Sequence, residues 1–244
     1  MSNLKLRTNI QELNKMSPAH FSNKPIQCME QYLENRGIYL KDGHEELICS
    51  VPVDKVIGHS QIYGEMKWGD CLNGEYLKRL DRNLRELENN PEYYLFDYDK
   101  SDMCFHQVED AFFICVGKHR TVVSKFFSHF NAEIFKGRNP LNNVTVLRKI
   151  VDYEFMYWKK EIERLQLLHP EINFTLKHKT KSDAVCLTLR SNNGRKFEFY
   201  NRNQLDDCIA SLKSPSLLSK IQSKDAHKMV SYRYFLKLRF LHVH

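Results

Sequence analysis

The sequence predicts a mixed α/β protein: an α+β core, a helical N-terminal extension and a small, basic α+β module at the C-terminus. Three observations lead to this prediction. Strand and helix patterns alternate through residues 45–155, alternating strands restart after residue 171, and the positive charge is concentrated in the C-terminal third. With 42% hydrophobic residues, the chain can bury a core. We predict an extension at 1–44, a core at 45–155, and a linking helix with the C-terminal module at 156–244.

Residues 1–44 show the pattern of a helical arm. Pro25 suits the first turn of a helix because that position needs no backbone N–H donor. Ile26 and Leu33 would lie on the apolar face of this helix, and Gly37 would end it. We expect this segment to pack against the core.

The core alternates apolar strands with amphipathic helices. The run Ala111–Val116 is apolar throughout, which favours a central strand with both faces covered. Leucines every three or four residues over 77–87 predict a helix that Asn73 caps and Pro91 stops. The complete set expected for the core is a strand at 47–53, the helix at 77–87, strands at 93–98 and 111–116, a helix from about Arg120 to Gly137, and a strand at 144–151.

The C-terminal part has shorter, alternating strands. A linking helix with apolar residues from Phe155 to Leu165 leads into it. Asn192-Asn193-Gly194 predicts a tight hairpin between two of the strands, and Asn203 would cap a short helix. A last strand is expected over 232–240. If it forms, Arg233, Lys237 and Arg239 project from one side, because alternate residues share a face.

The charge distribution points to a nucleic-acid partner. Residues 171–244 hold 14 Lys and Arg against 6 Asp and Glu, whereas residues 1–170 hold 23 against 24. A basic module on an otherwise neutral chain is typical of a protein that binds a polyanion, and Arg233, Lys237 and Arg239 are its candidate contacts. A solvated basic surface without a ligand is the alternative.

The seven cysteines and the hydropathy pattern indicate a cytoplasmic protein. The cysteine count is odd and no Cys-x-x-Cys pair occurs, which argues against a disulfide framework or a zinc finger. No apolar run approaches the roughly 20 residues of a membrane helix, and the first residues lack a secretory signal. We therefore expect no membrane partner; the pattern leaves the oligomeric state open.

The segment Gly117-Lys118-His119-Arg120-Thr121 is the main candidate for chemistry. It joins the predicted buried strand to the next helix. At a helix start several backbone N–H groups lack partners and the dipole is positive, so anions bind there. Gly117 allows close approach, and the next residues add charges and donors, which together predict a phosphate cradle. The alternative is a plain strand–turn–helix whose basic residues point to water.

This stretch resembles the ParB/sulfiredoxin superfamily over roughly residues 48–152. Its members begin with a strand of the Val-Pro-Ile-Asp-Lys-Ile kind, matched here by Val51-Pro52-Val53-Asp54-Lys55-Val56. They continue through an acidic turn and a hydrophobic strand into a Gly-x-His-Arg turn, matched by residues 109–120. Sulfiredoxins carry a catalytic cysteine between the Gly and the His, where this chain has Lys118.

The resemblance implies binding of a nucleoside triphosphate, ATP or CTP, with Mg²⁺, through Gly117, Lys118, His119, Arg120 and Thr121. Members include nucleotide-gated partition proteins, nucleases and small-molecule phosphotransferases. Combined with the basic C-terminal part, this favours a metal-dependent nuclease or nucleotide hydrolase that acts on nucleic acid. A non-catalytic nucleotide-gated DNA-binding protein and a phosphotransferase are the alternatives.

Phosphoryl chemistry also needs carboxylates that hold Mg²⁺ or activate a nucleophile. Glu65 and Asp70, in the polar stretch after the first core strand, are the candidates for both roles. His119 is a candidate general base, because the pKa of histidine lies near neutrality. Asp110 is closer in sequence, but we expect it at the far end of the strand at 111–116.

Overall fold

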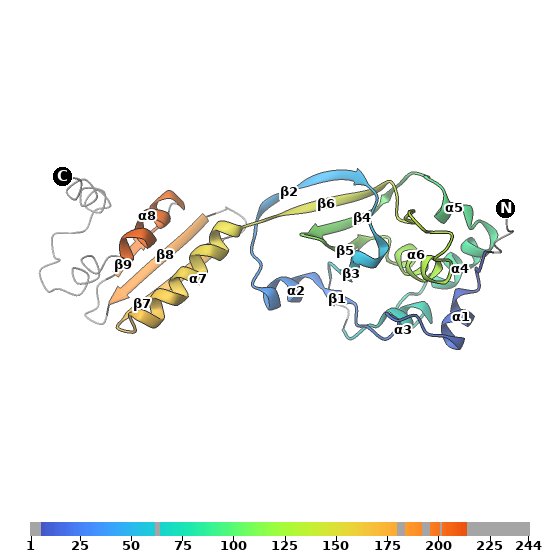
Figure 1. The fold of residues 1–244 in the computed structure, drawn as a ribbon, viewed down its shortest axis with the longest axis horizontal. Coiled ribbons are helices and arrows are strands. Elements are labelled where there is room, and N and C mark those ends of the chain that lie inside the picture. Colours follow the sequence, from blue (N-terminus) through green and yellow to red (C-terminus); the bar gives the residue numbers. More distant parts are fainter. Residues whose placement is uncertain (1–5, 62–63, 180–183, 192–195, 201, 214–244) are drawn as a thin grey trace, which may run out of the picture. The chain divides into compact units, whose positions relative to one another are not determined.

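The computed structural model describes residues 6–61, 64–179, 184–191, 196–200 and 202–213, and the chain divides into two units (Figure 1). The first unit contains Met1–Ile38 and Gly43–Val151; the second contains Tyr39–Asp42 and Asp152–His244. The segment expected as a separate extension thus belongs mostly to the first unit, and the main part of the second unit begins at Asp152. Among the described residues, no helix is long and apolar enough to cross a membrane.

The first unit is built on a six-stranded mixed sheet with the order β1-β3-β5-β4-β6-β2. β5 pairs in parallel with β3 and antiparallel with β4, and β4 pairs in parallel with β6. The strands are β1 (Gln27–Cys28), β2 (Leu40–Cys49), β3 (Val56–His59), β4 (Lys100–Val108), β5 (Ala111–Val116) and β6 (Val144–Val151).

β5 is the buried central strand that its sequence predicts. Phe112 and Ile114 belong to the main hydrophobic cluster, whereas the neighbouring ring of Phe113 lies 5.1 Å from the ring of Tyr32. Successive residues of a strand point to opposite faces, so both faces of β5 are covered. Every residue of the run Ala111–Ile114 is buried, because apolar groups cover both faces of the strand, and this explains why its sequence does not alternate with polar residues.

Helix α6 (Lys118–Phe130) follows β5 directly and is the centre of helix packing in this unit (Figure 1). Val122, Val123, Phe126 and Phe127 are all buried, at the spacing that predicts an inward face. The helices α1, α3 and α4 pack against α6. The helices of this unit other than α6 are α1 (Ile10–Met16), α2 (Met29–Arg36), the 3-10 helix η1 (Val53–Lys55), α3 (Trp68–Leu72), α4 (Leu80–Asn89) and α5 (Glu92–Leu95).

Several predicted boundaries in this unit are wrong. The strand expected at 93–98 is replaced by the short helix α5, and β4 is the strand that pairs with β5. Asn73 does not cap α4: it follows α3, and α4 begins only at Leu80. α6 ends at Phe130 rather than near Gly137, because the Asn131 side chain donates a hydrogen bond to the Phe127 carbonyl, 2.9 Å away, at the helix end.

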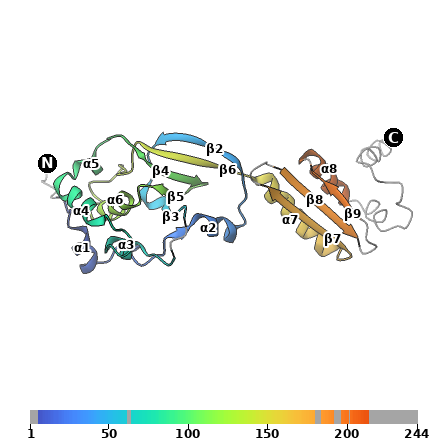
Figure 2. The same ribbon diagram turned by 180° about the vertical axis from the view of Figure 1, so that it is seen from behind.

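The second unit packs two helices on a three-stranded antiparallel sheet, β7-β8-β9 (Figure 2). This confirms the linking helix and the alternating strands that the sequence predicts. β8 and β9 pair antiparallel, while the predicted turn Asn192-Asn193-Gly194, like the strand expected at 232–240, lies outside the described residues. The elements are α7 (Tyr153–Leu168), β7 (Ile172–Lys179), β8 (Ala184–Ser191), β9 (Lys196–Phe199) and α8 (Arg202–Leu212).

A buried carboxylate anchors the start of α7. Asp152 is fully buried and accepts a hydrogen bond from the Phe155 backbone N–H at 3.1 Å. The Arg202 guanidinium donates to both of its oxygens, at 3.0 and 2.6 Å, and His178 lies 3.0 Å away. Burial raises the pKa of the Asp152 carboxyl, but the hydrogen bonds from Arg202 and Phe155 outweigh it and lower the pKa to about 2.

Candidate phosphate site

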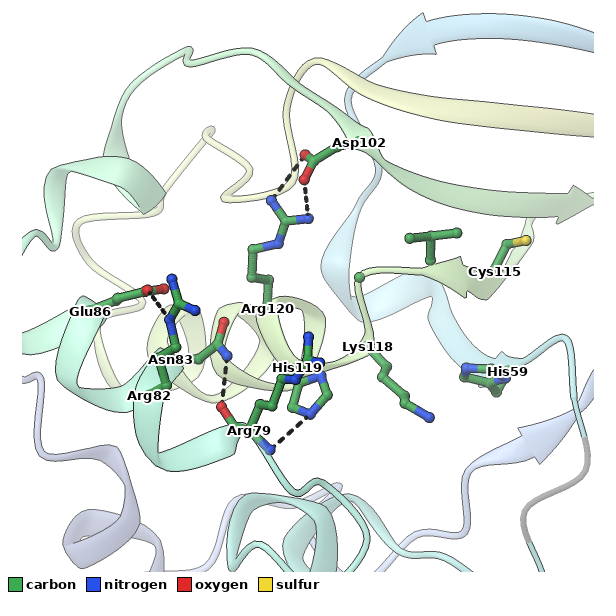
Figure 3. Close-up of a pocket in the computed structure, with 12 residues that line it drawn as sticks. His59, Arg79, Arg82, Asn83, Glu86, Asp102, Cys115, Lys118, His119 and Arg120 are labelled. Carbon is green, nitrogen blue, oxygen red and sulfur yellow. Dashed lines mark hydrogen bonds and ion pairs between the residues drawn. The ribbon is translucent and has the colours of Figure 1, made fainter.

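A cavity of about 580 Å³ opens in the first unit where β5 ends and α6 begins (Figure 3). Four of the five residues that the sequence predicts for phosphate binding, Gly117 to Arg120, lie in its wall. The remaining lining residues come from β3, α4 and the strands β4 and β5. They are His59, Arg79, Arg82, Asn83, Glu86, Asp102, Cys115 and Val116.

Gly117 sits at the cap position of α6 because its backbone needs a left-handed conformation. Its φ is 96° and its ψ is 25°, a region that side chains with a Cβ rarely adopt. A Cβ at this position would also lie 2.9 Å from Cγ and 3.0 Å from Cε of Met103, which is fully buried. Both restrictions make glycine the fitting residue, and they place the turn against the core rather than in solvent.

The first turn of α6 has an unusual charge for its position. No acidic residue lies in this turn and no side chain caps the helix. Lys118, His119 and Arg120 follow one another at the end where the helix dipole is positive. Helices stabilise anions and acidic side chains at this end, so consecutive basic residues here are unfavourable in the absence of a bound anion.

Arg120 is held by residues of the site itself. Its guanidinium makes a two-pronged ion pair with Asp102, at 3.0 and 2.6 Å, and donates to the Tyr93 hydroxyl at 2.8 Å. In Figure 3 its side chain points toward Asp102. Burial lowers the pKa of Arg120, but the hydrogen bonds that Arg120 donates to Asp102 and Tyr93 raise it above its ordinary value, so the group stays charged. Phosphate contact through Arg120 therefore competes with Asp102.

Two further cations, which the sequence did not predict for the site, are Arg82 of α4 and Arg79 at the N-cap of this helix. Arg82 is paired with Glu86 on the same helix, at 2.9 Å between Nε and Oε1. Among the described residues, the Arg79 guanidinium has no hydrogen-bond or ion-pair partner, although the Arg79 backbone N–H contacts the site. The amphipathic pattern identifies these arginines as the outer face of a helix; it does not show that this face turns toward α6.

The two histidines of the cavity are neutral. The Arg79 N–H donates to Nε2 of His119 at 3.3 Å, so the ring proton of His119 lies on Nδ1. Burial, and next the charge of Lys118, lower the pKa of His119 and bring that of His59 to about 4. To act as a general base through Nε2, His119 would first have to release the Arg79 N–H.

The lining of the cavity has an excess of positive charge. It contains four cationic side chains, Arg79, Arg82, Lys118 and Arg120, and two carboxylates, Glu86 and Asp102. Since both histidines are neutral near pH 7, the arrangement favours an anion with more than one negative charge.

Comparisons with family models, curated proteins and solved structures found no match.

The structure does not bring every predicted residue to this cavity. The hydroxyl of Thr121 is buried and donates back to the Gly117 carbonyl at 3.0 Å, inside the helix. Glu65 is exposed, Asp70 lies in α3, and neither lines the cavity. Asp110 pairs with Lys55 at the opposite end of β5, where we expected it.

Two further expectations concern the metal and the nucleic acid. The part of the chain that the structure describes contains no group of three or more His, Cys, Asp or Glu residues able to hold a metal ion. The predicted nucleic-acid contacts Arg233, Lys237 and Arg239 lie outside the described residues.

Proposed function

We propose that the first unit binds the triphosphate of a nucleotide, ATP or CTP, in the cavity at the start of α6. The observation that carries this proposal is the run of basic residues from Lys118 to Arg120 at the positive end of an uncapped helix. An anion at this position would satisfy N–H donors of the first turn and offset the repulsion between Lys118 and Arg120, the two charged residues of the run.

The other features of the cavity fit the same ligand. Its volume of about 580 Å³ lies in the range of small-molecule sites. Arg79 reaches it from α4 and Lys118 from α6, so a chain of phosphates can contact both helices (Figure 3). The position of the turn, between a buried strand and a helix, agrees with the ParB/sulfiredoxin fold and its nucleotide site, which this segment resembles.

The lining does not fit Mg²⁺ held by the protein alone. Its carboxylates, Glu86 and Asp102, are each paired with an arginine, and the predicted ligands Glu65 and Asp70 are absent from it. We therefore derive no metal-dependent step. A nuclease or nucleotide hydrolase, the activity that the sequence favours, stays a proposal that a turnover measurement decides.

Nucleic acid is the partner we propose for the C-terminal part. The support is the excess of 14 Lys and Arg over 6 Asp and Glu in residues 171–244. All seven cysteines are free, which fits the reducing cytoplasm that we propose as the location.

A nucleotide screen tests the proposed function. ATP, CTP, GTP and tripolyphosphate are added with and without Mg²⁺, and the melting temperature and the hydrolysis products are measured. A bound ligand at about 100 times its Kd should add about 2.7 kcal/mol to the free energy of unfolding. Turnover that requires Mg²⁺ would support the nucleotide hydrolase; stabilisation without turnover would support a nucleotide-gated binding protein.

A charge-matched pair of variants makes the screen specific. The double variant Arg79→Gln/Lys118→Gln removes two cations from the cavity and should lose the stabilisation. Lys160→Gln/Arg164→Gln removes the same charge from exposed positions of α7 and should keep it. No stabilisation of the parent protein by any of the four ligands, or equal loss in both variants, would overturn the proposal.

A further inference from the structure

A second cavity, of about 420 Å³, lies in the first unit and shares no lining residue with the phosphate site. Most of the surface of its wall is apolar, and its lining includes Lys125 from α6. A volume of this size can hold a small molecule. The apolar and aromatic lining consists of Phe21, Pro25, Val53, Val56, Ile57 and Trp68.

Lys125 is buried, with 6% of its surface exposed. Its ammonium donates to the carbonyls of Val53 and Val56, at 2.8 and 2.9 Å. It also lies 5.0 Å from the ring centre of Phe21 and 4.8 Å from that of Trp68. An ammonium has three N–H groups, and hydrogen bonds to described residues use two of them. The third has no oxygen or nitrogen acceptor there, and the rings of Phe21 and Trp68 offset only part of the cost of burying the charged group.

The charges around the cavity favour an anion over a cation. The lining includes the ammonium groups of Lys125 and Lys24 against the single carboxylate of Asp54. Burial, and next the charge of His20, lower the pKa of His129, so His129 adds hydrogen-bonding groups rather than charge near pH 7. Burial lowers the pKa of Lys125 to about 8, and the charge of Asp54 opposes this effect. Near pH 7 the amine is therefore still mostly protonated and able to donate.

We propose that this cavity binds a small, largely apolar carboxylate, such as an arylalkanoate or a short-chain alkanoate. The carboxylate accepts the third N–H of Lys125, and the apolar part fills the space lined by Phe21 and Trp68. Such a ligand would complete the hydrogen bonding of the ammonium and bury its own apolar surface. The proposal does not depend on nucleotide binding, because the two cavities are separate.

A structural role for Lys125 alone, in which it only ties η1 to α6, makes a different prediction. In that case the two carbonyl contacts are sufficient, and added carboxylates would not bind. A direct binding measurement at the cavity wall therefore distinguishes the two roles.

The chain contains two tryptophans, Trp68 in this cavity and Trp158 in the core of the second unit. Protein labelled with 5-fluorotryptophan gives one ¹⁹F resonance for each, and Trp68→Phe assigns them. The probes are phenylacetate, indole-3-acetate and hexanoate, each compared with its neutral amide at millimolar concentrations. We expect the acids to move the Trp68 resonance to saturation, to leave Trp158 in place, and to bind at least about tenfold more tightly than the amides.

Two variants complete the test. Lys125→Met keeps the length of the side chain but removes the charge, so it should abolish the preference for acids over amides. Lys125→Arg keeps the charge and should retain part of that preference. If Lys125→Met does not fold, the affinities of the parent protein for each acid and its amide still show whether the cavity prefers a carboxylate. No movement of the Trp68 resonance with any acid, or equal affinity for acids and amides, would overturn the proposal.

Discussion

Replacing Gly117 by alanine should destabilise the first unit through two separate costs. The first is the left-handed backbone: a residue with a Cβ at φ 96° costs about 1–2 kcal/mol. The second is the contact with Met103, whose Cγ would lie 2.9 Å from the new Cβ. Met103 is fully buried, so its displacement within the core costs about 1–3 kcal/mol. The expected loss for Gly117→Ala is thus about 2–5 kcal/mol.

Gly37→Ala is the matched control. Gly37 also has a positive φ, 62°, but a Cβ there would meet no atom within 4 Å. The substitution Gly37→Ala should therefore cost only the free energy of the left-handed backbone, about 1–2 kcal/mol. Urea unfolding followed by the ¹⁹F resonance of Trp68 measures both losses in the unit concerned. In a double-mutant cycle, Met103→Ala should show a coupling with Gly117→Ala of at least about 1 kcal/mol. Equal losses for the two glycines, without coupling, would refute the reasoning about Met103.

Three further predictions concern ionisable groups. His59 is 4% exposed and its pKa is lowered from 6.5 to about 4, so its neutral form contributes stability above pH 6.5 that is lost as the pH falls toward 4. His59→Gln should reduce this loss by up to about 3 kcal/mol, measured as the difference in the free energy of unfolding between pH 6.5 and pH 4. An unchanged pH dependence in the variant would contradict the lowered pKa of His59. Asp152→Asn should destabilise the second unit by about 3–5 kcal/mol near pH 7. Because the pKa of Asp152 is lowered from 3.8 to about 2, about 2 kcal/mol of stability should disappear from the parent protein as the pH falls from 3.8 through 2. Asp102→Asn should release Arg120 and thereby raise the affinity for tripolyphosphate several-fold, as measured by calorimetry. Asp110→Asn, at the other end of β5, is the control and should leave the affinity unchanged. A loss of affinity in Asp102→Asn would show instead that the ion pair is needed for binding.

The elements that the sequence predicts best are those in which local pattern and burial agree. β5 is apolar throughout and α6 repeats large apolar residues at helical spacing, and both surround Gly117. The glycine at the turn between them was therefore identifiable without a structure.

Elements with conflicting signals were missed. β4 includes Lys100, Asp102 and His106, so its composition conceals the strand that pairs with β5. Tyr93 and Tyr94 look like strand residues, but they belong to a short helix whose Tyr94 is buried in the core. Tertiary packing overrides local preference at both positions.

The site residues from other elements could not be predicted because they depend on how helices pack. The sequence pattern predicts that Arg79 and Arg82 lie on the solvent-exposed side of a helix. They reach the cavity because α4 packs against α6. Lys125 gives no signal at all, since a single lysine among apolar residues of a helix usually extends to water. Its burial depends on the carbonyls of η1 and β3.

An NMR titration tests the central claim most directly. Backbone amides of deuterated, ¹⁵N-labelled protein are followed while tripolyphosphate is added. If the phosphates bind at the start of α6, the amide resonances of Lys118, His119 and Arg120 should shift most, with Arg79 beside them, because these residues line the cavity. Shifts confined to residues 171–244, or no shifts at 117–120 at saturating ligand, would contradict the account.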